Sequence, residues 1–138
     1  PAQPASGLRG RRILVVEDNA TIRRILETML RHWGAEPLPA ATSAQALQEL
    51  TGTGRVDAAI IDLQMPELDG RALARSIREL AGRQTLPLVL LANPGRKENP
   101  GGHFRAILTK PAKPAQLFDA LLAIFAKRDG STAPVLPA

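Results

Sequence analysis

The sequence predicts an α/β domain in which helices cover both faces of a parallel β-sheet. Short, almost wholly apolar runs alternate along the chain with longer segments whose apolar residues recur every three or four positions. The first pattern indicates strands that are buried on both faces, and the second indicates amphipathic helices. Regular alternation of the two is typical of consecutive β/α units, and therefore of a parallel sheet.

Five short segments are predicted to be strands. The second of them contains Pro37 and Pro39, which cannot donate backbone hydrogen bonds, so we expect this strand at an edge of the sheet. The other four are apolar throughout. The predicted strands are Ile13–Val16, Glu36–Ala40, Ala58–Ile61, Leu88–Leu91 and Ala106–Leu108.

Four helices are predicted from apolar periodicity and from residues that start or stop helices. The first begins near Ile22 and is closed by Gly34, and Ser43 is expected to cap the second. The third covers Arg71–Ala81. The last starts at Pro114, because proline suits the first turn of a helix.

One β/α unit is abnormal. Between the fourth and fifth strands, Asn93–Phe104 contains two prolines and three glycines, so the fourth helix is expected to be shortened or missing. The expected fold is otherwise a flavodoxin-like (βα)5 doubly wound sheet with strand order 2-1-3-4-5. In that order, strands one and three meet at the switch point, where ligands bind.

Composition sets limits on the function. The 138 residues are enough for one domain with a buried core, and 44% of them are hydrophobic. The net charge is +5, but only 3% of the residues are aromatic, so we do not expect nucleic-acid binding. No apolar run is long enough to span a bilayer, so direct membrane contact is not expected either. Cysteine is absent, which excludes disulfides and thiolate metal sites and fits a cytoplasmic location.

Both ends of the chain have the composition of linkers. Residues 1–10 and 129–138 are rich in proline, alanine and glycine. The domain is therefore expected to cover residues 11–128, between a linker and a second linker or tail. The chain begins with Pro1, which indicates a domain from the interior of a longer protein.

Charged residues follow three of the predicted strands. They are Glu17 and Asp18 after the first strand, Asp62 after the third and Lys110 after the fifth. Because parallel strands end at the same edge of the sheet, we expect these side chains to converge. Three carboxylates offer the hard oxygen ligands of a divalent cation, and an ammonium group can pair with phosphate. Taken singly, each is also compatible with an ordinary surface or turn residue.

Together with the turn at Pro66–Gly70, this spacing resembles the receiver domain of two-component response regulators, over roughly residues 12–127. The segments Leu90–Arg96 and Leu108–Leu121 are especially similar to receivers inside hybrid sensor histidine kinases. The resemblance implies a domain that takes a phosphoryl group from a phosphohistidine of a histidine kinase or histidine phosphotransfer domain. It implies that the domain is a phosphoacceptor and not an enzyme. It also implies a cytoplasmic location, which includes the case of a cytoplasmic domain of a larger sensor protein.

By the same resemblance, Asp62 is the phosphoacceptor. Lys110 pairs with Asp62 at rest and with the transferred phosphoryl group afterwards. Mg²⁺ is the implied cofactor, held by Glu17, Asp18, Asp62 and the main-chain carbonyl of Gln64. A carboxylate repels an anionic phosphoryl donor, so this chemistry needs a cation that neutralises both partners.

Two positions depart from the family's pattern. Receivers usually carry Ser or Thr at the end of the fourth strand, where this chain has Ala92. They usually carry an aromatic residue at the position of Ile107. Both switch positions are thus degenerate. We expect phosphorylation chemistry to survive and the usual conformational readout to be lost.

Two other functions are compatible with parts of the pattern. A degenerate receiver would act as a phosphorylation-independent regulatory or protein-interaction module, which the missing switch residues favour and the intact acidic set opposes. A phosphatase of the haloacid dehalogenase type would need a second acid two residues after the nucleophile. This chain has Gln64 there, so we disfavour a phosphatase.

Overall fold

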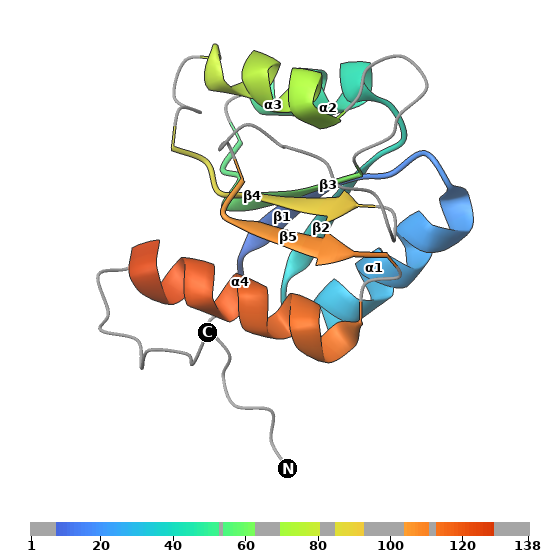
Figure 1. Ribbon diagram of the computed structural model, residues 1–138, viewed down its shortest axis with the longest axis vertical. Helices are drawn as coiled ribbons and strands as arrows, with labels where there is room; N and C mark the ends of the chain where they lie inside the picture. Colours follow the sequence, from blue (N-terminus) through green and yellow to red (C-terminus); the bar gives the residue numbers. More distant parts are fainter. Residues whose placement is uncertain are drawn as a thin grey trace.

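The computed structural model contains one sheet of five parallel strands in the order β2-β1-β3-β4-β5, as predicted (Figure 1). The structure describes residues 8–52, 54–62, 70–80, 85–92, 104–110 and 113–128. The strands are β1 (Arg12–Val16), β2 (Glu36–Ala40), β3 (Ala58–Asp62), β4 (Leu88–Ala92) and β5 (Ala106–Thr109). The proline-containing strand β2 lies at an edge, where two missing backbone donors cost the sheet least.

Four helices lie within the described residues, α1 and α4 on one face of the sheet and α2 and α3 on the other (Figure 1). They are α1 (Ala20–His32), α2 (Ser43–Thr51), α3 (Gly70–Arg78) and α4 (Pro114–Arg128). The predicted loss or shortening of a helix between β4 and β5 falls on residues 93–103, which lie outside the described part of the chain. None of the described helices is both long and apolar enough to cross a bilayer.

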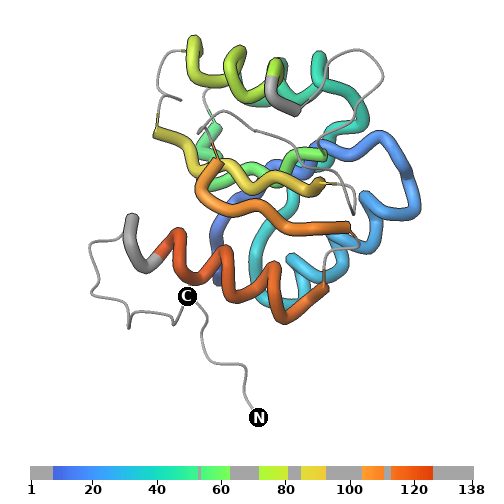
Figure 2. Tube along the Cα trace, in the orientation of Figure 1, coloured from blue at the N-terminus to red at the C-terminus, as the bar shows by residue number. Residues whose placement is uncertain are grey.

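The sheet separates two hydrophobic layers. Figure 2 traces the helices that lie above and below the central strands. Alternate residues of a strand point to opposite faces. Ile13 and Val15 of β1 therefore pack against the layer that contains Leu26 and Leu121, on the side of α1 and α4. The intervening Leu14 and Val16 belong to the opposite layer, with residues of α2 and α3. Burial on both faces explains why β1, β3 and β4 read as continuous apolar runs.

Helix α3 covers Gly70–Arg78, where the sequence predicted a helix near Arg71–Ala81, and the starts of α1 and α2 also differ from the prediction. Thr42, and not Ser43, caps α2: its backbone is extended, and its hydroxyl accepts a hydrogen bond from the Gln45 N–H at 3.0 Å. The capping hydroxyl must come from the last extended residue, and Ser43 is already helical and buried. Helix α1 begins at Ala20, before the apolar stripe, because Asn19 caps it.

The chain enters the sheet through a tight turn that we call the N-terminal turn, Leu8–Arg11. The Arg11 N–H donates to the Leu8 carbonyl at 3.0 Å. Gly10 has φ +77°, the left-handed conformation that a type II turn requires at its third residue and that glycine adopts without strain. The Leu8 side chain is completely buried, in the layer of α1 and α4.

Further contacts hold the N-terminal turn against the domain. The Gly10 N–H donates to the Gly34 carbonyl at 2.9 Å, and the Arg11 guanidinium lies 4.5 Å from the centre of the Phe125 ring in α4. Gly34 has φ +87°, and a Cβ there would come within 3.3 Å of the Arg9 backbone. The division between linker and domain at residue 10 remains a prediction, but the packed unit includes Leu8.

Candidate metal and phosphoryl site

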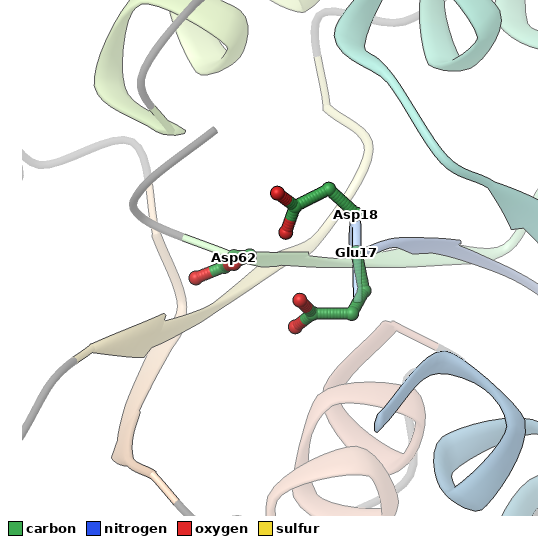
Figure 3. Close-up of side chains that lie close together, drawn as sticks. All are labelled: Glu17, Asp18 and Asp62. Atoms are coloured by element: carbon green, nitrogen blue, oxygen red, sulfur yellow. The ribbon is translucent and has the colours of Figure 1, made fainter. Parts of the chain in front are cut away.

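Three acidic side chains meet at the carboxyl ends of β1 and β3. These strands are neighbours with Val16 opposite Ile61, so the next residues, Glu17 and Asp62, lie side by side. Asp18 follows on the loop to α1. One carboxylate oxygen from each of the three lies within 4.8 Å of the other two. Figure 3 shows the three carboxylates directed toward a shared space.

The three acids differ in burial. Glu17 is 1% exposed and Asp62 is 2% exposed, whereas Asp18 is exposed at the rim. Buried carboxylates are costly unless a cation or hydrogen-bond donors compensate them. The arrangement is therefore one in which added positive charge stabilises the folded protein.

Lys110 supplies one such charge. Its Nζ lies 2.5 Å from Asp62 Oδ1, and its side chain is 20% exposed while that of Asp62 is 3% exposed. The Lys110 N–H donates to the Ala92 carbonyl at 2.8 Å, which anchors the end of β5 beside β4. The structure thus brings together the four side chains that the sequence predicted to converge.

Of the two buried acids, Glu17 has the weaker compensation for its charge. Burial raises the pKa of Glu17 to about 7, and the nearby Asp62 charge acts in the same direction. The Asn19 N–H donates to Glu17 Oε2 at 3.2 Å, and this bond and Lys110 lower the pKa in part. Glu17 Oε1 is buried and has no hydrogen-bond partner among the described residues.

The unpartnered oxygen provides a test of whether a metal fits. A divalent cation among Glu17, Asp18 and Asp62 would give Oε1 a partner and would relieve the repulsion among the three acids. The donors are all oxygen and one of them is at the exposed rim, a combination that suits Mg²⁺, which keeps several waters. The donor set therefore fits this ion.

The loop from β1 to α1 contains two residues that sequence reasoning missed. Asn19 Oδ1 accepts a hydrogen bond from the Ile22 N–H at 3.0 Å and caps α1. Arg23 Nη1 donates to the Glu17 carbonyl at 2.8 Å. Asn19 stands three residues before Ile22, where the apolar stripe begins, and asparagine is a preferred capping residue, so the cap could have been identified. Nothing in the residue pattern indicated the contact of Arg23.

The other predicted positions are placed as follows. Ala92 is 8% exposed at the end of β4, opposite Thr109 of β5. Ile107 is 51% exposed on the edge strand β5. Gln64, predicted to offer its main-chain carbonyl, lies outside the described residues.

Comparison with protein families gives a match over most of the chain. The family model of the response regulator receiver domain matches residues 13–122. Sensor protein TorS of Escherichia coli (strain K12) is 33% identical over 122 residues, which cover 84% of this chain and 13% of TorS. Histidine kinase 2 of Arabidopsis thaliana is 42% identical over 73 residues, covering 53% of this chain and 6% of that protein. The chain thus spans a small part of the length of these relatives.

Solved structures agree with the family match. A response regulator receiver domain protein from Clostridium thermocellum has a TM-score of 0.79 at 25% identity, covering 86% of this chain and 97% of that one. The receiver domain of a sensor histidine kinase from Pseudomonas aeruginosa PAO1 has a TM-score of 0.73 at 32% identity, covering 88% and 99%. The latter structure is described with a magnesium ion coordinated in its active-site cleft.

Proposed function

Because the chain belongs to the family of response regulator receiver domains, we propose that it accepts a phosphoryl group on Asp62 from a phosphohistidine. The donor is a histidine kinase or a histidine phosphotransfer domain. One observation carries the proposal: the buried Asp62 carboxylate lies 2.5 Å from Lys110 Nζ and within 4.8 Å of carboxylate oxygens of two further acids. One edge of the sheet thus carries a nucleophile, the ammonium group that pairs with it and a set of possible metal ligands.

Asp62 is the nucleophile in this proposal. One of its carboxylate oxygens forms a bond to phosphorus as the phosphorus–nitrogen bond of the phosphohistidine breaks, and the electron pair remains on the imidazole. Lys110 orients Asp62 beforehand through the ion pair at Oδ1. The compact ammonium group then follows the negative charge to the transferred phosphoryl oxygens. The other Asp62 oxygen stays available to the metal site.

Glu17, Asp18 and Asp62 would hold Mg²⁺, together with the main-chain carbonyl of Gln64 that the family pattern adds. When bound, the ion neutralises charge on Asp62 and on the incoming phosphoryl group. Glu17, whose Oε1 is buried and has no partner among the described residues, would supply a buried ligand oxygen. Asp18 would supply a ligand from the exposed rim of the site.

The protein donor needs a surface beside the site. Ile22 and Ile25 are among the exposed large hydrophobic residues, at 36% and 50% exposure. Both lie in the first two turns of α1, which begins directly after Glu17 and Asp18. We propose this part of α1 as a contact for the phosphohistidine protein. Replacing Ile25 with Ser should slow transfer from the protein donor and leave transfer from a small acyl phosphate unchanged.

The domain is proposed to act as a phosphoacceptor and not as an enzyme, within residues 11–128 and in the cytoplasm. Its length relative to TorS and Histidine kinase 2 supports placing it inside a longer sensor protein. A second function is favoured by Ala92 and Ile107: a degenerate receiver that regulates by binding a partner without phosphorylation. Neither residue provides the hydroxyl or ring of the usual switch.

Phosphorylation with a small acyl phosphate and Mg²⁺, followed by intact-mass spectrometry, separates the two functions. We expect one added phosphoryl group on the natural chain, none on Asp62→Asn, and strong slowing when a chelator removes Mg²⁺. The matched control is Asp119→Asn, at an exposed position of α4, which should be labelled like the natural chain. Labelling of Asp62→Asn at the natural level would contradict the assignment. No labelling of the natural chain by any donor would favour the binding module.

A further inference from the structure

We infer that Arg23 is a positioning residue for the acidic site, and that it acts by holding the peptide that joins Glu17 to Asp18. The metal step of this inference rests on the proposed function. Arg23 lies in the first turns of α1, and its side chain reaches back past that turn. There Nη1 donates to the Glu17 carbonyl at 2.8 Å, in a partly buried contact.

The Glu17 backbone is held from two sides. Its N–H donates to the Ala40 carbonyl at the end of β2, at 3.1 Å, and its carbonyl accepts from Arg23. That carbonyl belongs to the rigid plane of the peptide between Glu17 and Asp18. Fixing the oxygen therefore fixes the orientation of the N–H and Cα of Asp18.

Asp18 is the ligand that depends most on this control. Glu17 and Asp62 are buried and their surroundings restrict them, whereas Asp18 is exposed. If the peptide group before Asp18 were free to rotate, the exposed Asp18 would lose conformational entropy when it bound a cation. With the peptide held by Arg23, its carboxylate already faces the shared space that Figure 3 shows. Partners of this kind, which orient the ligands without binding the metal, are worth roughly 10- to 100-fold in metal affinity elsewhere.

The charge of Arg23 predicts the opposite effect. A guanidinium beside an acidic cluster weakens cation binding by simple repulsion, so removing it should tighten binding if charge were all that mattered. Arg24 provides the matched control, because it is the next residue of the same helix, carries the same charge and is exposed. Positioning and charge therefore predict effects of opposite sign on the affinity for Mg²⁺.

The test is a Mg²⁺ titration of the natural chain, Arg23→Met and Arg24→Met. Binding is monitored by the amide chemical shifts of residues 17–19. We expect Arg23→Met to weaken Mg²⁺ binding about tenfold and Arg24→Met to change it by less than about twofold, in the tighter direction. Arg23→Lys should recover part of the affinity because an ammonium can still reach a carbonyl. Equal or tighter binding in Arg23→Met would overturn the inference while leaving the proposed function intact.

Hydrogen exchange of the Asn19 amide tests the positioning without the metal. This N–H donates to Glu17 Oε2, so freeing the Glu17 carbonyl should loosen it. We expect exchange to be about tenfold faster in Arg23→Met than in Arg24→Met. Cooperative thermal unfolding of both variants serves as the control that they are folded. Unchanged exchange would overturn the inference. Absence of any Mg²⁺ response in the natural chain would instead overturn the proposed function, and the exchange rates would still decide the role of Arg23.

Discussion

Each end of the sheet has a buried carboxylate, and the two carboxylates differ in their hydrogen-bond partners. At the amino ends, Asp57 is 8% exposed, and its Oδ2 accepts hydrogen bonds from the Arg12 N–H at 2.8 Å and from Arg55 Nε at 3.1 Å. At the carboxyl ends, Glu17 is 1% exposed and keeps one oxygen without a partner among the described residues. Burial is common to both, so burial alone does not distinguish a functional acid from a structural one.

The difference lies in what compensates the charge. Arg55 also donates to the Gly10 carbonyl, at 2.6 Å, so the group around Asp57 links β1, the approach to β3 and the N-terminal turn. All of its partners belong to the protein. Around Glu17, the nearest charges include Asp62, which is itself negative. A carboxylate whose compensation is incomplete is ready for a cation from solution, and this condition marks the functional end of the sheet.

The largest expected effect is the loss of stability when the compensated acid is neutralised. Asp57→Asn weakens the hydrogen bonds from the Arg12 N–H and from Arg55 Nε to a buried anion, so the free energy of unfolding should fall by about 3 kcal/mol. Urea unfolding measures this change, and Asp119→Asn at an exposed site should differ from the natural chain by less than about 0.5 kcal/mol. A loss of that small size in Asp57→Asn would remove the contrast between the two ends.

The same type of substitution at the other end should have the opposite sign. Glu17→Gln removes a buried charge that no cation compensates, so at pH 8 and without Mg²⁺ the free energy of unfolding should rise by about 2 kcal/mol. Mg²⁺ should then stabilise this variant much less than the natural chain. A destabilised Glu17→Gln would show that Glu17 is a structural acid like Asp57.

The raised pKa of Glu17 makes this contrast depend on pH. The usual pKa of 4.5 applies to the unfolded chain, and burial raises the pKa of Glu17 to about 7 in the folded protein. Between these values the folded protein binds more protons than the unfolded chain, so this group's contribution to stability falls as pH rises. Without Mg²⁺, the thermal midpoint of the natural chain should therefore decline relative to that of Glu17→Gln between about pH 4.5 and pH 7.

Added Mg²⁺ should reverse that trend, because the ion binds only the ionised carboxylate. The increase in thermal midpoint caused by Mg²⁺ should grow as pH rises through about 7 in the natural chain. Parallel curves for the natural chain and Glu17→Gln, with and without Mg²⁺, would place the titrating group elsewhere.

The smallest expected effect is the conformational change that phosphorylation causes at a distance from Asp62. A ligand shifts a conformational equilibrium only by its differential affinity for the two states, and Ala92 and Ile107 provide neither a hydroxyl nor a ring to make that difference. With beryllofluoride as a phosphate mimic, amide shifts should stay near Asp62–Met65 and Ala92–Gly95. Large shifts across β5 and α4 would show that another element has taken over the coupling.

Much of the fold was predictable because one rule generates it. Strands buried on both faces are apolar throughout, so β1, β3 and β4 appeared clearly in the pattern. Parallel strands end at one edge, so Glu17, Asp62 and Lys110 could be brought together from their places after three strands. The edge position of β2 followed from Pro37 and Pro39.

What escaped prediction depends on side-chain contacts across many residues. Arg12 and Asp57 are 45 residues apart, and only the pairing of β1 with β3 brings them together. The contact of Arg23 with the Glu17 carbonyl depends on one side-chain conformation. Thr42 and Ser43 both carry a hydroxyl, so their order could not reveal which one caps α2.

The N-terminal turn has a mechanical consequence. Without the N-terminal turn, the backbone before β1 would be free to rotate. Instead, Leu8 is completely buried and the Arg11 guanidinium lies over the Phe125 ring of α4. The described chain is therefore anchored at Leu8, at the end of the sheet opposite the acidic site. A force applied at Leu8 would be transmitted through its buried side chain to the layer of α1 and α4, and through Arg11 to Phe125.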